Sequence, residues 1–225
     1  MHTAEEIRGV YVITDAVLRP DRSHVEIARA AVQGGSRVIQ LRDKEASDSE
    51  LIPIAREIRR ITAEAGAIFI VNDRIEVALA SDADGLHIGQ EDMPVADARK
   101  RWPERLLGVS VGSPEEAVTA ERDGADHLGV GPIYSTSTKL DAGAATGLEL
   151  IGRIRQVCRL PMVAIGGIGL SNIAEVARAG AESAAVISAV VCADDMVTAT
   201  RALVEAWGRW AVTSDQSKPP LPTDH

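Results

Sequence analysis

The stretch Ala177–Ile187, ARAGAESAAVI, joins an alanine-rich segment to a short apolar run through a single glycine. Glycine readily ends a helix, and a short apolar run is typical of a buried strand. The same order of residue types returns at 30–41 (AAVQGGSRVIQL), 63–71 (AEAGAIFIV) and 120–130 (AERDGADHLGV). A unit that repeats along the chain in this way predicts alternating helices and strands.

The predicted strands are apolar throughout, which is typical of a parallel sheet covered by helices. Besides the four strands of the repeat, candidates lie at Val10–Thr14, Gly85–Ile88, Leu107–Val111 and Met162–Ile165. The count is about eight units of roughly 25 residues, which predicts an α/β fold of the (β/α)₈ TIM barrel type. The alternative is an open, doubly wound sheet, although no G-x-G-x-x-G turn follows the first strand.

We expect a single barrel domain over residues 1–212, followed by a disordered polar tail at 213–225 that is rich in proline. Two helix starts carry clear signals. Ser23 is followed three residues later by Glu26, and Ser113 by Glu116, which is the spacing of a capping box.

The composition of the chain argues against some classes of binding partner. The net charge of −9 argues against nucleic acid or an anionic membrane, and no apolar run is long enough to cross a bilayer. The start, MHTAEEIRG, has no signal-peptide character. Cys158 and Cys192 lack metal-ligand spacing, so we interpret both as reduced core thiols of a cytoplasmic protein. An apolar helix face could serve a homo-oligomer.

The loop after the sixth predicted strand is rich in hydroxyl groups. Leu128–Lys139 reads LGVGPIYSTSTK and ends in a cation. Small residues allow the backbone to approach a ligand, hydroxyls donate hydrogen bonds, and Lys139 supplies positive charge. The loop is therefore a candidate phosphate site, with a flexible surface loop as the alternative.

The segment after the second strand carries Gln40, Arg42 and Lys44 at two-residue spacing. In an extended chain this spacing places an amide and two cations on one side, with Asp43 on the other. The arrangement suits a polyanion. A solvated charged loop is the alternative.

Two aspartates follow neighbouring strands. Asp73 follows the third strand and Asp92 the fourth, and in a barrel the carboxyl ends of strands meet around one cleft. Mg²⁺ is typically bound by one or two carboxylates together with substrate phosphates. The alternative for each aspartate is a helix cap. His87 and His127 lie inside strands and are interpreted as structural residues.

The last two strands end in glycine and small residues. Gly166-Gly167 follows the seventh strand and Ile187-Ser188 the eighth. Such loops frequently bind phosphate in TIM barrels, so we favour this function over tight turns alone. Ser110, after the fifth strand, either contacts substrate or belongs to a turn. No Ser/His/Asp arrangement is evident.

These segments together closely resemble the thiamine-phosphate synthase family, whose members are (β/α)₈ enzymes of vitamin B1 synthesis. The matching motifs, in family order, are YVITD (11–15), QLRDK (40–44), NDR (72–74), DGLHIGQEDMP (84–94), GVS (108–110), GVGPIYSTSTK (129–139), VAIGGI (163–168) and VISA (186–189). The resemblance implies a transferase that joins a hydroxymethylpyrimidine diphosphate to a thiazole phosphate, or to its carboxylated form, and releases pyrophosphate.

The resemblance also implies roles for individual residues. The pyrimidine diphosphate is expected at Gln40, Arg42, Lys44, Asn72, Ser110 and Lys139, with Leu41 and Asp43 of the same segment among the substrate contacts. Asp73 and Asp92 are implied ligands of one Mg²⁺ ion per subunit. The thiazole phosphate is expected at Thr136, Ser137, Thr138, Gly167, Ile187 and Ser188. Lys139, Arg42 and Ser110 are the implied catalytic residues.

The sequence departs from the family pattern at a few positions. Asp43 stands where Glu is usual, Ser135 where Pro is frequent, and Val111-Gly112-Ser113 replaces a stretch that often contains His. Two other functions stay open at this point. One is the related thiazole tautomerase, which isomerises without Mg²⁺, and the other is a phosphate-binding scaffold without catalysis.

Overall fold

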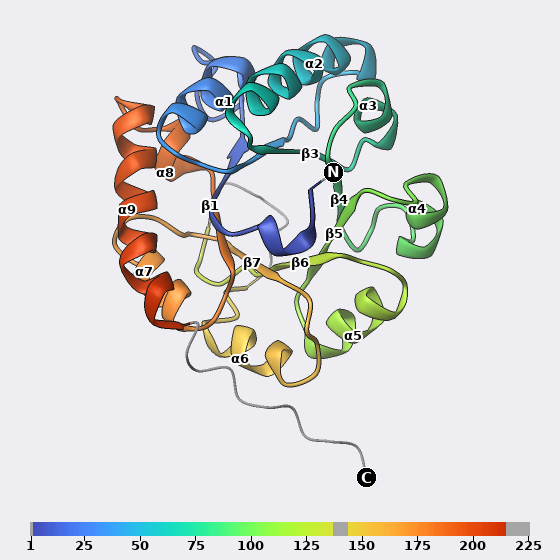
Figure 1. Cartoon of the computed structure of the whole chain (residues 1–225), viewed down its shortest axis with the longest axis vertical. Helices are drawn as coiled ribbons and strands as arrows, with labels where there is room; N and C mark the ends of the chain where they lie inside the picture. Colours follow the sequence, from blue (N-terminus) through green and yellow to red (C-terminus); the bar gives the residue numbers. More distant parts are fainter. Residues whose placement is uncertain (1, 137–143, 215–225) are drawn as a thin grey trace.

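The computed structural model of the chain describes residues 2–136 and 144–214. Eight parallel strands pair in sequence order, and β8 pairs with β1, so the sheet is a closed barrel. Closure confirms the predicted TIM barrel and makes the open-sheet alternative wrong. In Figure 1 the strands surround a common centre and the helices form a ring outside them.

The strands fall where the apolar runs predicted them, with bounds that differ by at most a residue or two. They are β1 (Gly9–Thr14), β2 (Val38–Leu41), β3 (Ile68–Asn72), β4 (Gly85–Ile88), β5 (Leu106–Val111), β6 (His127–Val130), β7 (Met162–Ile165) and β8 (Ser183–Val186). The helices are η1 (Ala4–Glu6), α1 (His24–Gln33), α2 (Asp48–Ala65), α3 (Ile75–Ala80), α4 (Val95–Arg101), α5 (Pro114–Arg122), α6 (Glu149–Arg155), α7 (Ile173–Arg178), α8 (Ser188–Val191) and α9 (Met196–Ser214).

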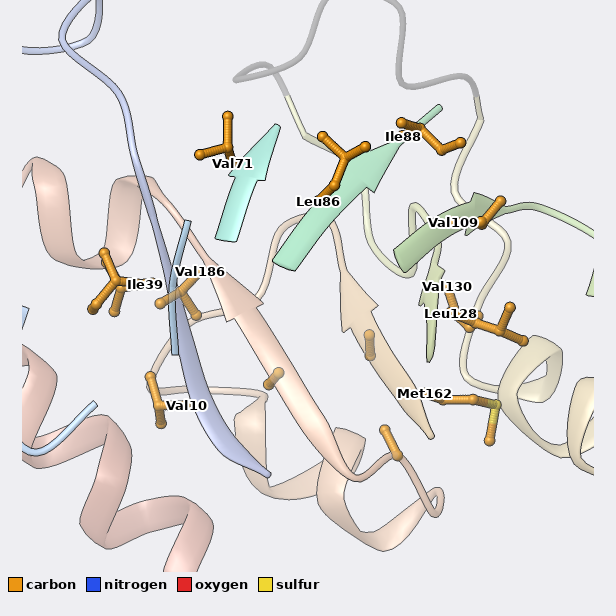
Figure 2. Packing of buried hydrophobic residues seen from close by; sticks show 14 of the residues in the cluster. Val10, Ile39, Val71, Leu86, Ile88, Val109, Leu128, Val130, Met162 and Val186 are labelled. Carbon is orange, nitrogen blue, oxygen red and sulfur yellow. The ribbon is translucent and has the colours of Figure 1, made fainter. Parts of the chain in front are cut away.

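Side chains alternate between two hydrophobic layers because successive strand residues point to opposite faces. The outer layer packs the strands against the helices. Figure 2 shows part of it, including Val10, Ile39 and Val71. The large aliphatic content of this layer explains how a chain with only 3% aromatic residues builds a full core.

The inner layer fills the barrel. Its buried cluster includes Tyr11, Val38 and Ile70, joined by Ile7 from the N-terminal segment. Figure 1 shows this segment crossing in front of the barrel, and Ile7 is fully buried. Since the strands begin on this side, the N-terminal end of the barrel is closed by apolar packing.

Local signals end the helices as the sequence predicts. Ser23 and Glu26 form the expected capping box, and α2 ends at Gly66 in the left-handed conformation, with φ 63°. The second box differs. Ser113 caps α5, but the Glu116 carboxylate accepts from Gly112 N–H at 2.7 Å, one residue before the cap.

The expectation for the cysteines needs correction, and the expectation for the C-terminal tail concerns residues that lie mostly outside the described range. Both cysteines are free, but only Cys158 is buried, and Cys192 is exposed, so the core assignment of Cys192 was wrong. Helix α9 extends to Ser214, two residues beyond the expected end of the domain. The rest of the expected tail, 215–225, lies outside the described residues.

Candidate functional site

A cavity opens at the carboxyl ends of the strands and gathers most of the predicted site residues. From that set it is lined by Gln40, Arg42, Lys44, Asn72, Asp73, Asp92, Ser110, Thr136, Gly167, Ile187 and Ser188. Ser137, Thr138 and Lys139 lie outside the described residues. Leu41 and Asp43 are not among the residues that line the cavity.

Strand alternation separates Leu41 and Asp43 from their neighbours. Leu41 is buried in the outer hydrophobic layer. The Asp43 carboxylate accepts from Glu45 N–H and Ala46 N–H, both at 2.9 Å, and its other oxygen lies 3.0 Å from His24 Nε2. Asp43 therefore shapes the loop after β2 and anchors it to α1. Its side chain does not reach the cavity.

The two cations of this segment reach different partners. Arg42 NH1 lies 3.4 Å from Asp15 Oδ2, and Lys44 Nζ lies 3.8 Å from Asp73 Oδ2. The Arg42 side chain is 17% exposed and that of Lys44 is 47% exposed. A guanidinium at the wall and an ammonium at the mouth give the cavity a positive side, which an anionic ligand would meet.

Asp73 adopts a backbone conformation that few residues other than glycine tolerate, with φ 61°. Its N–H donates to the His87 carbonyl at 2.8 Å, and Arg74, not Asp73, occupies the N-cap position of helix α3. The Asp92 carboxylate turns back to accept from Gly89 N–H at 2.7 Å, and α4 is capped by Pro94. The helix-cap alternatives for both aspartates are therefore wrong.

Asp92 affects the protonation of Asp73. Burial, followed by a hydrogen bond to Asp92 and the charge of Asp92, raises the pKa of Asp73 to about 6 from its ordinary 3.8. Lys44 and Arg42 oppose the shift but do not cancel it. Two neighbouring carboxylates offer oxygen ligands to a hard cation, which would relieve their repulsion. The pair therefore fits Mg²⁺.

The described residues contain no group of three or more His, Cys, Asp or Glu side chains arranged for a metal. A site with two carboxylates leaves most of the coordination sphere to water and to the ligand. This is the usual pattern for Mg²⁺ bound together with a phosphorylated substrate.

The cavity continues into the barrel, where Tyr11 and His87, which the sequence did not assign to the site, join the predicted residues Gln40 and Ser110. Tyr11 and Gln40 are both buried, and Gln40 Nε2 donates to the Tyr11 hydroxyl at 2.7 Å. His87 also lines the cavity, with its Nε2 3.0 Å from Ser110 Oγ. Ser110 is thus a cavity residue, and His87, interpreted from the sequence as structural, lies beside it on the cavity wall.

A second histidine lies deeper. His127 is fully buried, 5.7 Å from His87 between ring centroids, and neither of its nitrogens has a hydrogen-bond partner among the described residues. Burial, and then the nearby His87, lowers the pKa of His127 well below its usual value. Gly108 makes room for both rings, because an added Cβ would lie 2.3 Å from His127 Nε2 and 2.4 Å from His87 Nδ1.

The loop after β7 brings its backbone close to the loop after β6. Gly167 has φ 60°, and an added Cβ would lie 2.6 Å from the Ser135 carbonyl oxygen and 2.9 Å from Tyr134 Cβ. Only glycine fits this conformation and this contact. With Ile187 and Ser188 from the end of β8, the loop forms the side of the cavity predicted to hold a phosphate.

The chain matches the family model described as thiamine monophosphate synthase over residues 10–190. The chain belongs to this family. A curated thiamine-phosphate synthase from Methanospirillum hungatei is 52% identical over 194 residues, which are 86% of this chain and 94% of that protein. One from Chloroflexus aurantiacus is 54% identical over 194 residues, covering 86% of this chain and 90% of the relative.

Solved structures agree with the family and the fold. Thiamine phosphate pyrophosphorylase from Pyrococcus furiosus superposes with a TM-score of 0.85 at 42% identity, covering 91% of this chain and 98% of that one. A 3-hexulose-6-phosphate synthase reaches a TM-score of 0.67 at 18% identity, covering 88% and 99%. The second likeness shows the barrel alone.

Membership of the thiamine monophosphate synthase family makes the chain an enzyme of the transferase class, with a place in thiamine biosynthesis. The motifs quoted from the sequence thus identify the family correctly. Among the described residues, no helix has the length and apolar character needed to span a membrane.

Proposed function

We propose that the enzyme condenses a hydroxymethylpyrimidine diphosphate with a thiazole phosphate, in a Mg²⁺-dependent reaction that releases pyrophosphate. The observation that carries this proposal is the Asp73–Asp92 pair beside Arg42 and Lys44 at the mouth of one cavity. These groups suit a metal-bound diphosphate. A reaction that expels pyrophosphate needs negative charge to be stabilised there.

The reaction requires few other functional groups from the protein. The bond between the methylene carbon and the diphosphate oxygen breaks, and its electron pair leaves with pyrophosphate. The lone pair of the thiazole nitrogen forms the new carbon–nitrogen bond, so no general base is required. Because the electron-rich aminopyrimidine ring stabilises positive charge on the methylene, a dissociative path is favoured.

Each part of the cavity has a role in this scheme. Arg42 and Lys44 hold the diphosphate by charge-assisted hydrogen bonds. Asp73 and Asp92 would hold Mg²⁺, which supplies electrostatic stabilisation of the leaving group when bound. Gln40 and Ser110 present polar groups to the pyrimidine ring between apolar walls that include Val163 and Ile165. Such a slot orients a flat heterocycle.

The thiazole phosphate belongs on the opposite side, near Gly167, Ile187 and Ser188. The tight backbone at Gly167 and the hydroxyl of Ser188 suit a phosphate group. Thr136 lines the cavity from the loop after β6. For Ser137, Thr138 and Lys139, the proposal keeps the roles implied by the family motif: phosphate contacts for the hydroxyls and leaving-group stabilisation for Lys139.

The test supplies the purified enzyme with both substrates and measures pyrophosphate and thiamine phosphate, with Mg²⁺ or with a chelator. We expect equimolar formation of both products with Mg²⁺ and none with the chelator. An isomerised thiazole phosphate, with neither pyrophosphate nor thiamine phosphate formed, would indicate an isomerase such as the thiazole tautomerase. Binding of thiazole phosphate without any turnover would indicate a non-catalytic scaffold.

A further inference from the structure

Asp15 is a buried carboxylate that follows β1 and lies next to the cavity wall. The residue is 4% exposed. Its Oδ1 accepts from Val17 N–H at 2.9 Å and from Leu18 N–H at 3.0 Å. Two backbone donors on one oxygen fix the orientation of the carboxylate and leave Oδ2 for another partner.

That partner is Arg42. The register places Thr14 opposite Leu41, so Asp15 and Arg42 occupy adjacent positions at the rim of the barrel. Asp15 Oδ2 lies 3.4 Å from Arg42 Nη1. In the part of the chain that the structure describes, the guanidinium has no second hydrogen-bond or ion-pair partner. A guanidinium has five N–H donors, so most of them stay available to a ligand.

We propose that Asp15 is a positioning residue, which acts through Arg42 to hold its guanidinium ready for the diphosphate. This inference rests on the proposed function. Asp15 is not among the residues that line the cavity. Its negative charge is therefore set behind the guanidinium and away from the anionic ligand, a placement that favours orientation without direct repulsion.

The physical benefit is preorganisation. A free arginine side chain loses rotamer freedom when it is fixed on a ligand, and this loss weakens binding. A side chain already fixed by Asp15 has lost much of that freedom before the ligand binds. The same fixed charge then faces the leaving group as negative charge develops on it, with little reorganisation.

The decisive experiment is a double-mutant cycle of D15N and R42Q. Asparagine keeps an oxygen for the Val17 and Leu18 amides but presents an NH₂ group to Arg42. We expect D15N to lower kcat/KM for the pyrimidine diphosphate by about tenfold, with KM raised more than kcat is lowered. In the R42Q background, D15N should change kcat/KM by less than about twofold.

A second variant guards against loss of the fold. In Asp15→Ser the hydroxyl still accepts from the turn amides but does not reach Arg42. Asp15→Ser should also lower kcat/KM, and this effect should disappear in the R42Q background. Asp123→Asn, which alters an exposed ion pair with Arg122 on α5, controls for the change in net charge and should retain wild-type kinetics.

Equal effects of D15N with and without Arg42, or wild-type kcat/KM in D15N, would overturn the proposal. So would loss of the fold in both Asp15 variants, since the carboxylate would then serve the turn. Calorimetric titration with inorganic pyrophosphate and Mg²⁺ separates this proposal from the proposed function. If the wild type binds pyrophosphate with Mg²⁺ and D15N weakens this binding, Asp15 is supported as a positioning residue even where no turnover occurs. Equal binding by the two proteins refutes that role.

Discussion

Replacing Asp73 by asparagine should stabilise the metal-free protein at neutral pH. The pKa of Asp73 is about 6 in the folded state, against an ordinary 3.8. Between these values the folded state holds a proton that the unfolded state releases, so the stability contributed by this group is full below pH 3.8 and is lost as pH rises through 6. Above pH 6 the folded protein carries a strained negative charge.

The magnitude follows from the shift. About two pKa units at 1.36 kcal/mol each give an upper bound of roughly 3 kcal/mol for the free energy that D73N recovers at pH 7.5. The shift already includes the opposing charges of Lys44 and Arg42, and solvent screening at this partly exposed rim lowers the figure further. We therefore expect D73N to raise the free energy of unfolding by about 1–3 kcal/mol.

The choice of asparagine matters because Asp73 has φ 61°. Asparagine tolerates the left-handed conformation and keeps the shape of the side chain. Asp73→Ala removes the same charge but strains the backbone by about 1–3 kcal/mol, so it should gain less than D73N or nothing. Comparing the two variants separates the electrostatic part from the conformational part.

Urea unfolding between pH 4 and 8 with a chelator measures the effect. The advantage of D73N over the wild type should be largest above pH 6 and disappear near pH 4. Added Mg²⁺ should stabilise the wild type above pH 6 and have little effect on D73N. A D73N protein that is less stable than the wild type at pH 7.5, with an unchanged m-value, would refute the reasoning.

Three further predictions concern other parts of the site. Because burial keeps His127 neutral, the wild type should lose stability as pH falls below about 6.5, so the stability of His127→Leu relative to the wild type should rise by about 1.4 kcal/mol per pH unit there; an offset independent of pH would contradict a neutral His127. Gly129→Ala places a Cβ 2.8 Å from His87 Cε1, so kcat/KM should fall by more than about tenfold, and wild-type kinetics would show that the inner end of the cavity is not used. Asp92→Ala should lower turnover by at least about a hundredfold with the circular dichroism spectrum unchanged, and near-normal turnover would exclude Asp92 as a metal ligand.

The fold was predictable because each helix–strand unit carries its own local sequence signals. The bounds of β2, β4 and β7 agree with their apolar runs, and Gly66 ends α2 in the conformation that glycine favours. Closure followed from counting units, since parallel strands with covering helices have few arrangements. The precise cap contacts were less predictable: the Glu116 carboxylate binds one residue earlier than its spacing suggests.

The interior of the site was missed for a related reason. In a parallel barrel both faces of a strand are buried, so Tyr11 and His87 look like ordinary core residues in the sequence. The register is what aims them inward, and it brings His87 beside Ser110 on the next strand. One signal was available: Tyr11 and Ile13 stand two residues apart in β1, and alternate residues of a strand face the same side, here the cavity.

The proposed metal site illustrates why the spacing of single residues did not decide their role. Asp73 and Asp92 each precede a helix, and a cap is the more frequent use of such a residue. The difference lies in the backbone, because the left-handed turn at Asp73 and the bond from Gly89 N–H to Asp92 direct the two carboxylates toward each other. The repulsion between the two carboxylates costs stability at neutral pH. A closed barrel with an extensive outer core tolerates that cost at its rim, and a cation that joins the two carboxylates would convert it into binding energy.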